Sequence, residues 1–342
     1  MRKIALALVL AVSLCATAAQ SIITERITLS ASADSLKLSV LIIKPSAKPR
    51  AIVQLVHGMC EYKERYIPFM RFLANQGYVC VMHDNRGHGH SVKTFDDLGY
   101  FYDGGYTATI DDVLEVTKMI KSAYPDLPLF LFGHSMGSMV VRSYAKRYDS
   151  ELSGLIVCGS PSYDPQCVLG IPLTNLLVKQ KGGHYRSQKI NDMAFRYHNK
   201  KFVEDATGPV SPHAWICSNP KVVARYDADP MCNFIFTVNG FNNLFDLMRD
   251  AYDRHDWKMD NPDMPIWFIA GADDPCIISE RKFEVAAGNM NNVGYTNVTS
   301  KLYPNMRHEI LNETKRQTVW NDILAQLNAW TKGVKNKKAA AK

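Results

Sequence analysis

The sequence predicts an α/β fold, in which a mostly parallel, twisted sheet has helices on both faces and an inserted helical cap. Short apolar segments alternate with amphipathic helical patterns along most of the 342 residues. That alternation is typical of a parallel sheet that is buried on both faces. About one hundred residues interrupt it once, and it then resumes toward the C-terminus. An interruption of this kind is the mark of an insertion into the sheet.

The strands are expected where short apolar runs end in turn residues. "LKLSVLII" alternates between apolar and polar residues, whereas "LPLFLFG" is continuously apolar, as in a fully buried strand. In order, the predicted strands are 36–43, 51–58, 78–84, 127–133, 154–160, 265–271 and 300–304. Apolar residues at helical spacing predict helices near 61–75, 106–123, 136–148, 279–287 and 313–332.

The interval 161–261 contains no strand of this kind. It holds helical pieces rich in aromatic residues and methionine, such as "FIFTVNGFNNLFDLMRDAY". A segment this long is too large for a connection between two strands, so we expect a cap or lid. The chain then divides into a core (20–160), the cap (161–261), the rest of the core (262–331) and a basic flexible tail (332–342). An extra subdomain with no part in function is the alternative.

The N-terminus "MRKIALALVLAVSLCATAA" combines a basic start, an apolar stretch and small residues, which is the pattern of a signal peptide over 1–19. We therefore expect an exported protein, periplasmic or extracellular. A lipid anchor at Cys15 is not favoured, because Leu14 is bulky where such signals need a small residue.

The net charge of +7 does not describe a basic face. Two charges lie in the signal segment and five lysines lie in the last eleven residues, so the body of the protein is neutral. This distribution argues against a nucleic-acid partner. A weak contact with a membrane surface, through the basic tail or the cap, stays open. The seven cysteines after the signal segment include no Cys-x-x-Cys pair, so neither a zinc site nor a disulfide framework is predicted.

One motif indicates catalysis by a serine nucleophile. In "LFGHSMGSMV", Gly133 and Gly137 flank Ser135, with His134 and Met136 between them. A strand is predicted before this G-x-S-x-G and a helix after it, the setting in which a tight turn exposes the serine hydroxyl as a nucleophile. Such a hydroxyl needs a neighbouring base to become reactive.

The base and its orienting acid are expected after later strands. His308 follows the last predicted strand, and "GADDP" follows the strand before it. We favour Asp274 as the acid that orients His308, with Asp273 as the alternative. Two backbone N–H groups would then stabilise an oxyanion. One is that of Met136, and the other is that of Met59, which follows His57 and Gly58 in "VHGMCE".

These blocks together resemble a known family. "HGMCEYKERY", "HDNRGHGHS", "GHSMGS", "GADDP" and "RHEILNE" match in order those of α/β-hydrolases of the monoacylglycerol lipase, lysophospholipase and serine aminopeptidase group, over about residues 25–330. The resemblance implies the α/β-hydrolase fold, with Ser135, Asp274 and His308 as the triad and with no cofactor. It also implies that Glu61 and Arg65 brace the oxyanion loop or contact polar groups of the substrate.

Two further groups of residues, a histidine cluster and two cysteines, were considered as functional sites. His83, His88 and His90 lie near Asp84, but no converging metal geometry is indicated, and the family uses the aspartate and arginine of this block as structural ties. No metal is predicted. Cys60 and Cys276 lie near the oxyanion loop and the acid, as ordinary semi-buried residues or as sites of thiol-reagent sensitivity.

The predicted function is that of an exported serine hydrolase. The aromatic cap residues favour medium- or long-chain esters, monoacylglycerols or lysophospholipids, cleaved through an acyl-enzyme intermediate. The cap residues that could line an acyl channel, or else pack the cap itself, are Met193, Phe195, Phe202, Trp215, Phe234, Phe236, Phe241, Leu244 and Phe245. A proline-releasing serine aminopeptidase is the alternative enzyme. A binding protein on a catalytically dead hydrolase fold is disfavoured, because all three triad residues are present. The sequence sets no oligomeric state.

Overall fold

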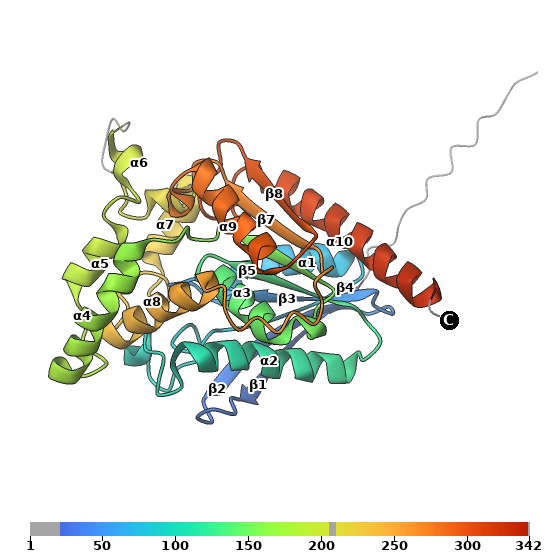
Figure 1. The fold of residues 1–342 in the computed structure, drawn as a ribbon, viewed down its shortest axis with the longest axis horizontal. Coiled ribbons are helices and arrows are strands. Elements are labelled where there is room, and N and C mark those ends of the chain that lie inside the picture. The colour runs from blue at the N-terminus through green and yellow to red at the C-terminus, as the bar shows by residue number, and fades with distance from the viewer. Residues whose placement is uncertain (1–20, 205–209, 341–342) are drawn as a thin grey trace, which may run out of the picture.

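The computed structural model describes residues 21–204 and 210–340. The predicted signal peptide and Cys15 lie outside these residues. An eight-stranded sheet forms the centre of the molecule (Figure 1), in the order β1-β2-β4-β3-β5-β6-β7-β8. The strands are β1 (Ile22–Ser30), β2 (Lys37–Pro45), β3 (Ala51–Val56), β4 (Tyr78–His83), β5 (Leu129–His134), β6 (Gly154–Cys158), β7 (Ile266–Gly271) and β8 (Val298–Tyr303). Only β2 runs antiparallel to its neighbours, β1 and β4. The mostly parallel sheet is therefore confirmed.

The seven predicted strands correspond to β2 through β8. Strand β1 was not predicted from the sequence. This strand lies at the sheet edge, paired only with β2, and most of its side chains are at least partly exposed. It carries Glu25 and Arg26 in its middle, so it lacks the apolar run by which the other strands were recognised. An edge strand needs little apolar character, because only one of its sides is paired.

Helices cover both faces of the sheet, and alternate strand residues point to opposite faces. In β4, Val79 and Val81 join one buried cluster while Cys80 and Met82 join the other. The first cluster is covered by α2 (Gly105–Ala123), α3 (Met136–Tyr148), α8 (Val238–Tyr252) and α9 (Glu280–Val293). The second is covered by α1 (Ile67–Asn75) and α10 (Arg316–Ala340). The core is thus two apolar layers separated by one sheet.

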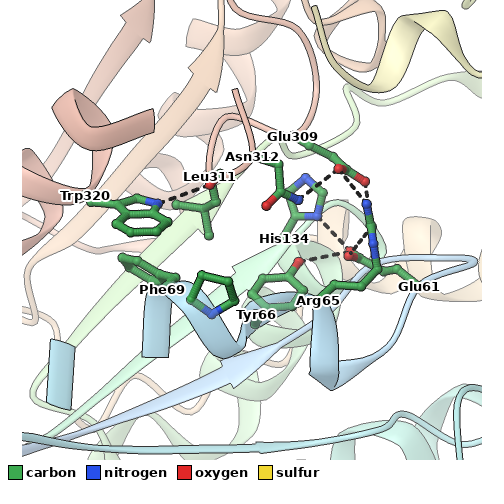
Figure 2. Close-up of a pocket in the computed structure, with 10 residues that line it drawn as sticks. Glu61, Arg65, Tyr66, Phe69, His134, Glu309, Leu311, Asn312 and Trp320 are labelled. Carbon is green, nitrogen blue, oxygen red and sulfur yellow. Dashed lines mark hydrogen bonds and ion pairs between the residues drawn. The ribbon is translucent and has the colours of Figure 1, made fainter. Parts of the chain in front are cut away.

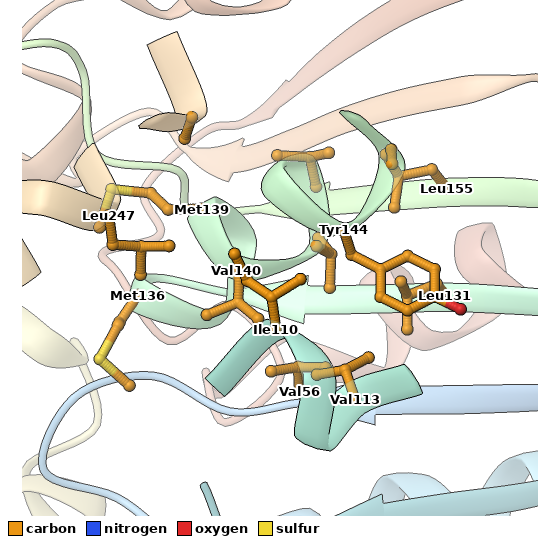
Figure 3. Close-up of a cluster of buried hydrophobic side chains, with 14 of the residues drawn as sticks. Val56, Ile110, Val113, Leu131, Met136, Met139, Val140, Tyr144, Leu155 and Leu247 are labelled. Atoms are coloured by element: carbon orange, nitrogen blue, oxygen red, sulfur yellow. The ribbon is translucent and has the colours of Figure 1, made fainter. Parts of the chain in front are cut away.

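The start of α3 is held by the first layer. Figure 3 shows side chains from β3, α2, β5, α3, β6 and α8 meeting around it; the labelled ones are Val56, Ile110, Val113, Leu131, Met136, Met139, Val140, Tyr144, Leu155 and Leu247. Each of these is at most 1% exposed. Full burial of one such side chain stabilises a fold by roughly 1.5–3 kcal/mol. The turn that precedes α3 is therefore built on a rigid base.

The insertion between β6 and β7 is helical in its described part. It contains α4 (Pro165–Lys181), α5 (Gln188–Phe195), α6 (Lys200–Glu204), α7 (Pro220–Ala228) and α8, and its described residues add no strand to the sheet, only an isolated bridge between Arg186 and Thr237. The helices α4, α5 and α6 gather at one end of the molecule (Figure 1). Helix α8 packs against both α4 and α3, so it joins the insertion to the core.

The C-terminal segment differs from the prediction of a flexible tail from residue 332. Helix α10 continues to Ala340. Lysine and alanine both have high helix propensity, so a segment rich in them extends the preceding helix, although Gly333 and Asn336 interrupt it. None of the helices in the described part of the chain has the length and apolarity that crossing a bilayer would require.

Candidate active site

Ser135 occupies a strained turn between β5 and α3. Its backbone has φ 54° and ψ −121°, a conformation that is rare for a residue with a side chain. A Cβ atom added to Gly133 would lie 2.3 Å from the carbonyl oxygen of Gly137, and one added to Gly137 would lie 2.3 Å from that of Val56. The two glycines are therefore required by contact between backbones. This is the strand–turn–helix setting that the motif predicted.

Asp274 and His308 form a buried hydrogen-bonded pair. The Nδ1 of His308 lies 2.9 Å from Oδ2 of Asp274, and both residues are 3% exposed. The other carboxylate oxygen, Oδ1, accepts a hydrogen bond from the backbone N–H of Cys276 at 2.8 Å. Because a carboxylate can only accept, Nδ1 carries the proton and Nε2 is left as the basic nitrogen. This is the tautomer that a general base needs.

The alternative acid, Asp273, points elsewhere. Its Oδ1 accepts a hydrogen bond from Nζ of Lys201 at 2.6 Å, and its side chain is 32% exposed. Between the two candidates, the hydrogen bond to His308 belongs to Asp274 alone. Lys201 comes from α6, so Asp273 joins the cap to the loop after β7.

The loop after β3 lies against the nucleophile turn. A Cβ atom added to Gly58 would lie 2.8 Å from Cβ of Ser135 and 2.7 Å from Oε1 of Glu61. Met59 follows, and Cys60 has φ 54°, the same left-handed value as Ser135. Strained residues thus adjoin both predicted oxyanion donors, the N–H groups of Met59 and Met136. His57 is fully buried and its Nε2 accepts a hydrogen bond from the N–H of Asn85 at 2.8 Å.

Glu61 fixes this loop from beneath. Its Oε1 accepts hydrogen bonds from the N–H of Gly58 (2.6 Å), from Nδ1 of His134 (2.9 Å) and from the Tyr66 hydroxyl (3.0 Å). Its Oε2 accepts one from Arg65 at 3.1 Å (Figure 2). Burial alone would raise the pKa of Glu61, but His134 and Arg65 lower it below its ordinary value, so the residue is ionised. The prediction that Glu61 and Arg65 brace this loop agrees with these contacts.

Glu309 is a member of the site that the sequence reading did not single out. Arg65 donates hydrogen bonds to both of its carboxylate oxygens, at 2.7 and 2.8 Å, and Glu309 is 5% exposed. Glu309 directly follows His308, so this ion pair joins the oxyanion loop to the loop of the predicted base (Figure 2). In the sequence, only its position directly after His308 distinguishes Glu309, and that position does not reveal its partner.

His134 completes the network as a cation. Its Nδ1 faces Glu61 and its Nε2 lies 3.2 Å from the carbonyl oxygen of His308. Both partners are acceptors, so both ring nitrogens donate and the ring is an imidazolium. Burial would lower the pKa of His134, but the Glu61 carboxylate outweighs it and raises the pKa. A cavity of about 10 Å³, the size of one water molecule, adjoins this network.

The histidine-rich block after β4 is structural. Asp84 accepts hydrogen bonds from Nζ and N–H of Lys63 at 2.6 and 2.8 Å, and the Nε and Nη2 of Arg86 bind Asp112 at 2.9 and 3.0 Å. His83 and His88 are fully buried, and burial lowers the pKa of each to about 3.

Two groups of side chains in the described chain have metal-ligand atoms within 4.8 Å of one another. In the group of Glu64, Asp84 and His90, the ammonium of Lys63 already lies 3.2 Å from Glu64 and 2.6 Å from Asp84, which supplies the positive charge. The other group is Asp274, Cys276 and His308, whose carboxylate and imidazole are joined in the pair described above. Neither set of contacts calls for a cation.

The cap reaches the predicted base through aromatic rings. The ring centroid of Trp215 lies 5.1 Å from that of His308, and those of His198 and Phe195 lie 4.9 and 6.1 Å from Trp215. Burial lowers the pKa of His198 to about 4, so its ring is neutral near pH 7.

Other predicted channel residues serve packing or lie at the surface. Phe236, Phe241 and Phe245 belong to the buried core, and Met193 is 54% exposed.

Cys60 and Cys276 are both buried. The Sγ of Cys60 lies 3.2 Å from the carbonyl oxygen of Phe234. Burial raises the pKa of both thiols well above the ordinary value, and for Cys276 the Asp274 carboxylate adds to this. The thiolate is the reactive form of cysteine, so neither residue is activated.

The twisted sheet, the serine turn and the acid–histidine pair at the ends of later strands are those of an α/β-hydrolase. The chain belongs to the serine aminopeptidase S33 family, whose profile matches residues 47–315.

Individual relatives agree with this family. The chain is 24% identical over 286 residues to the monoacylglycerol lipase of Mycolicibacterium smegmatis, covering 82% of this chain and 88% of that protein. It is 24% identical over 292 residues to mouse monoglyceride lipase, covering 84% of each. Among solved structures, a thermostable carboxyl esterase from Bacillus coagulans superimposes with a TM-score of 0.81 at 28% identity, over 90% of this chain and 99% of that one.

Proposed function

We propose that the protein is an exported serine hydrolase that cleaves carboxylic esters of medium- or long-chain lipids, monoacylglycerols or lysophospholipids, through an acyl-enzyme. The observation that carries this proposal is the buried His308–Asp274 pair, whose residues follow the ends of β8 and β7 in the parallel sheet in which β5 ends at the Ser135 turn. The relatives named as monoacylglycerol lipases and carboxyl esterase support an ester as the substrate.

The mechanism follows from the protonation states. Nε2 of His308 takes the hydroxyl proton of Ser135 as the oxygen attacks the ester carbonyl, and Asp274 stabilises the imidazolium that forms. The N–H groups of Met59 and Met136 stabilise the oxyanion. Collapse of the tetrahedral intermediate breaks the bond to the alcohol oxygen, which takes the proton from His308. Water then repeats the sequence on the acyl-enzyme and releases the acid.

The cap supports a lipid substrate and contact with a lipid surface. Leu169, Leu173 and Leu176 lie on one face of α4 and are 76%, 42% and 49% exposed. Their spacing places them on one stripe of the helix. Exposed apolar residues in a row are unusual on a protein surface and favour an apolar partner. A lipid aggregate that carries the substrate is such a partner.

Export rests on the N-terminal pattern alone. Expression of the full chain in a secreting host, followed by N-terminal sequencing of the product outside the cytoplasm, tests it. Cleavage after Ala18 or Ala19 supports export. A product that stays in the cytoplasm with residues 1–19 attached would exclude it.

The reaction is tested with chromogenic acyl esters from acetyl to palmitoyl. The mature chain is compared with Ser135→Ala and with Ser150→Ala, an exposed serine as control. We expect rates that peak at medium or long chains, that vanish in Ser135→Ala and that stay unchanged in Ser150→Ala. Intact esters together with cleavage of proline arylamides would assign the protein to the aminopeptidases, the function after which its family is named.

A further inference from the structure

A buried arginine outside the triad has no acidic partner. Arg142 lies on α3 and is fully buried, yet its Nε and Nη2 have no hydrogen-bond acceptor in the described chain. Its remaining polar contact is one long hydrogen bond to Oγ of Ser160 (3.5 Å), and its guanidinium lies over the rings of Tyr252 (4.1 Å) and Phe268 (5.8 Å). A buried cation without a counter-charge is costly, so Arg142 is a candidate for interaction with an anion from outside the fold.

A groove of about 600 Å³ is lined by the same tyrosine, whereas Arg142 is not among its lining residues. Tyr252 and Tyr163 form an aromatic wall, with ring centroids 5.5 Å apart, and Val285 adds an aliphatic surface. Asn289 also lines the groove. It is 4% exposed, and its Nδ2 donor has no partner. Two buried side chains with unpartnered donors therefore lie near the groove. Arg142 contacts the Tyr252 ring of its aromatic wall, and Asn289 lines the groove itself.

The acidic residues of this groove are already neutralised. Asp250 accepts two hydrogen bonds from Arg147 at 2.8 and 2.9 Å, and Asp253 accepts one from Lys146 at 2.8 Å. These pairs bind the carboxylates from the side of α3. Neither aspartate is therefore free to receive a cationic ligand.

Two cations at the groove remain unpaired. The Lys282 side chain makes no hydrogen bond or ion pair within the described residues, and Arg254 donates only its Nε, to Oδ1 of Asn289 at 3.0 Å. With Arg142 behind the aromatic wall, the groove carries excess positive charge. A volume of this size suits a small ligand, and the combination of cations with apolar walls suits an anion that carries an apolar chain.

We propose that this groove is a second binding site, separate from the catalytic centre, for an amphiphilic carboxylate such as a fatty acid. Naming the fatty acid rests on the proposed function, since that acid is the product of lipid ester hydrolysis. The carboxylate is held by Lys282, Arg254 and Nδ2 of Asn289. The apolar chain lies along Tyr163, Tyr252 and Val285.

A short segment joins the two sites. A Cβ atom on Gly159 would lie 3.4 Å from Oδ2 of Asp274, Ser160 contacts Arg142, and Tyr163 lines the groove. The Tyr252 hydroxyl also donates to the carbonyl oxygen of Pro161 at 2.7 Å. The groove is thus one loop away from the acid of the triad.

The test is calorimetric titration of laurate into the mature chain carrying Ser135→Ala, alone and combined with groove substitutions. Lys282→Ala and Asn289→Leu should each weaken one binding component at least about tenfold, the equivalent of losing one charged hydrogen bond. Arg281→Ala, which removes an exposed arginine of the same helix outside the groove, should leave it unchanged. Identical isotherms for all these variants would overturn the proposal. So would inorganic phosphate competing as well as laurate, because the apolar chain would then add nothing.

Arg142→Met adds a second readout. If Arg142 interacts with a ligand and does not stabilise the fold, Arg142→Met should leave the thermal midpoint of the ligand-free protein unchanged or raise it. The same substitution should weaken laurate binding. A lower midpoint would show that Arg142 serves the fold. Ester hydrolysis by these variants with Ser135 intact is followed in parallel. Normal ester hydrolysis together with no laurate-binding component that depends on Lys282 or Asn289 contradicts only the groove. Laurate binding that depends on these residues, in a chain that does not hydrolyse esters, contradicts only the proposed function.

Discussion

Arg65 donates two hydrogen bonds to Glu309, at 2.7 and 2.8 Å, and thereby joins the predicted oxyanion loop to the residue that follows His308. The same guanidinium also contacts Glu61, which holds the N–H of Gly58. Two loops that come from opposite ends of the sequence are thus fixed to each other beneath the serine turn. We expect the geometry of the triad to depend on this buried pair as much as on the triad residues.

The coupling between these two residues is measurable by a double-mutant cycle. Arg65→Met and Glu309→Met should each destabilise the fold by about 3–5 kcal/mol, because the first leaves Glu309 without its cation and the second leaves Arg65 with only its contact to Glu61. The double variant should lose less than the sum of the two, by about 1–3 kcal/mol. Denaturant unfolding gives these values. If the two single-variant losses of stability simply add in the double variant, the Arg65–Glu309 pair has no measurable coupling energy.

The assignment of the acid is tested by two neighbouring substitutions. Asp274→Asn should lower kcat by a factor on the order of 10⁴, because an amide no longer holds the productive tautomer of His308. Asp273→Asn is the matched control and should stay within about threefold of the parent, since it removes one partly exposed ion pair with Lys201. Ester hydrolysis at saturating substrate is the measurement. A large loss of kcat in Asp273→Asn and a small one in Asp274→Asn would instead make Asp273 the acid that orients His308.

The glycines of the serine turn are a steric requirement. Gly137→Ala should destabilise the fold by at least about 3 kcal/mol, since its Cβ would meet the carbonyl oxygen of Val56 at 2.3 Å. Gly288→Ala, in α9, places a Cβ in open space and should stabilise by about 0.5–1 kcal/mol. Thermal unfolding of both variants compares them directly. Equal effects would show that the turn tolerates a side chain.

The protonated state of His134 predicts a pH dependence of stability. Its pKa is raised in the folded protein above the ordinary 6.5, so its contribution is full below 6.5 and is lost as the pH rises through the folded value. The stability difference between the parent and His134→Gln should therefore shrink at alkaline pH. His255→Gln, at an exposed histidine, is the control. A difference that grows with pH would contradict a charged His134.

Much of the fold was predictable because buried strands and amphipathic helices carry strong patterns. All seven apolar strands were found, and α3 matches its predicted bounds of 136–148. The edge strand β1 was not predicted because its residues are partly exposed and do not form an apolar run. The helical end of α10 was missed because a lysine- and alanine-rich tail was taken as frayed, although both residues favour helix.

The placement of the candidate site residues was predictable for a similar reason. Ser135, Asp274 and His308 each follow a strand, and that placement is visible in the sequence. Glu309, Arg142 and Asn289 were not predictable, because their significance depends on which partner each side chain meets or lacks in space. A buried arginine looks like any helical arginine until its neighbours are known.

The central claim, that Ser135 is a nucleophile activated by His308, is tested most directly by covalent trapping. The mature chain is treated with a fluorophosphonate, digested, and examined by mass spectrometry, beside Ser135→Ala and His308→Gln. We expect a single phosphonylated peptide with the adduct on Ser135, no adduct in Ser135→Ala and strongly slowed labelling in His308→Gln. An adduct on another residue, or unchanged labelling without His308, would contradict it.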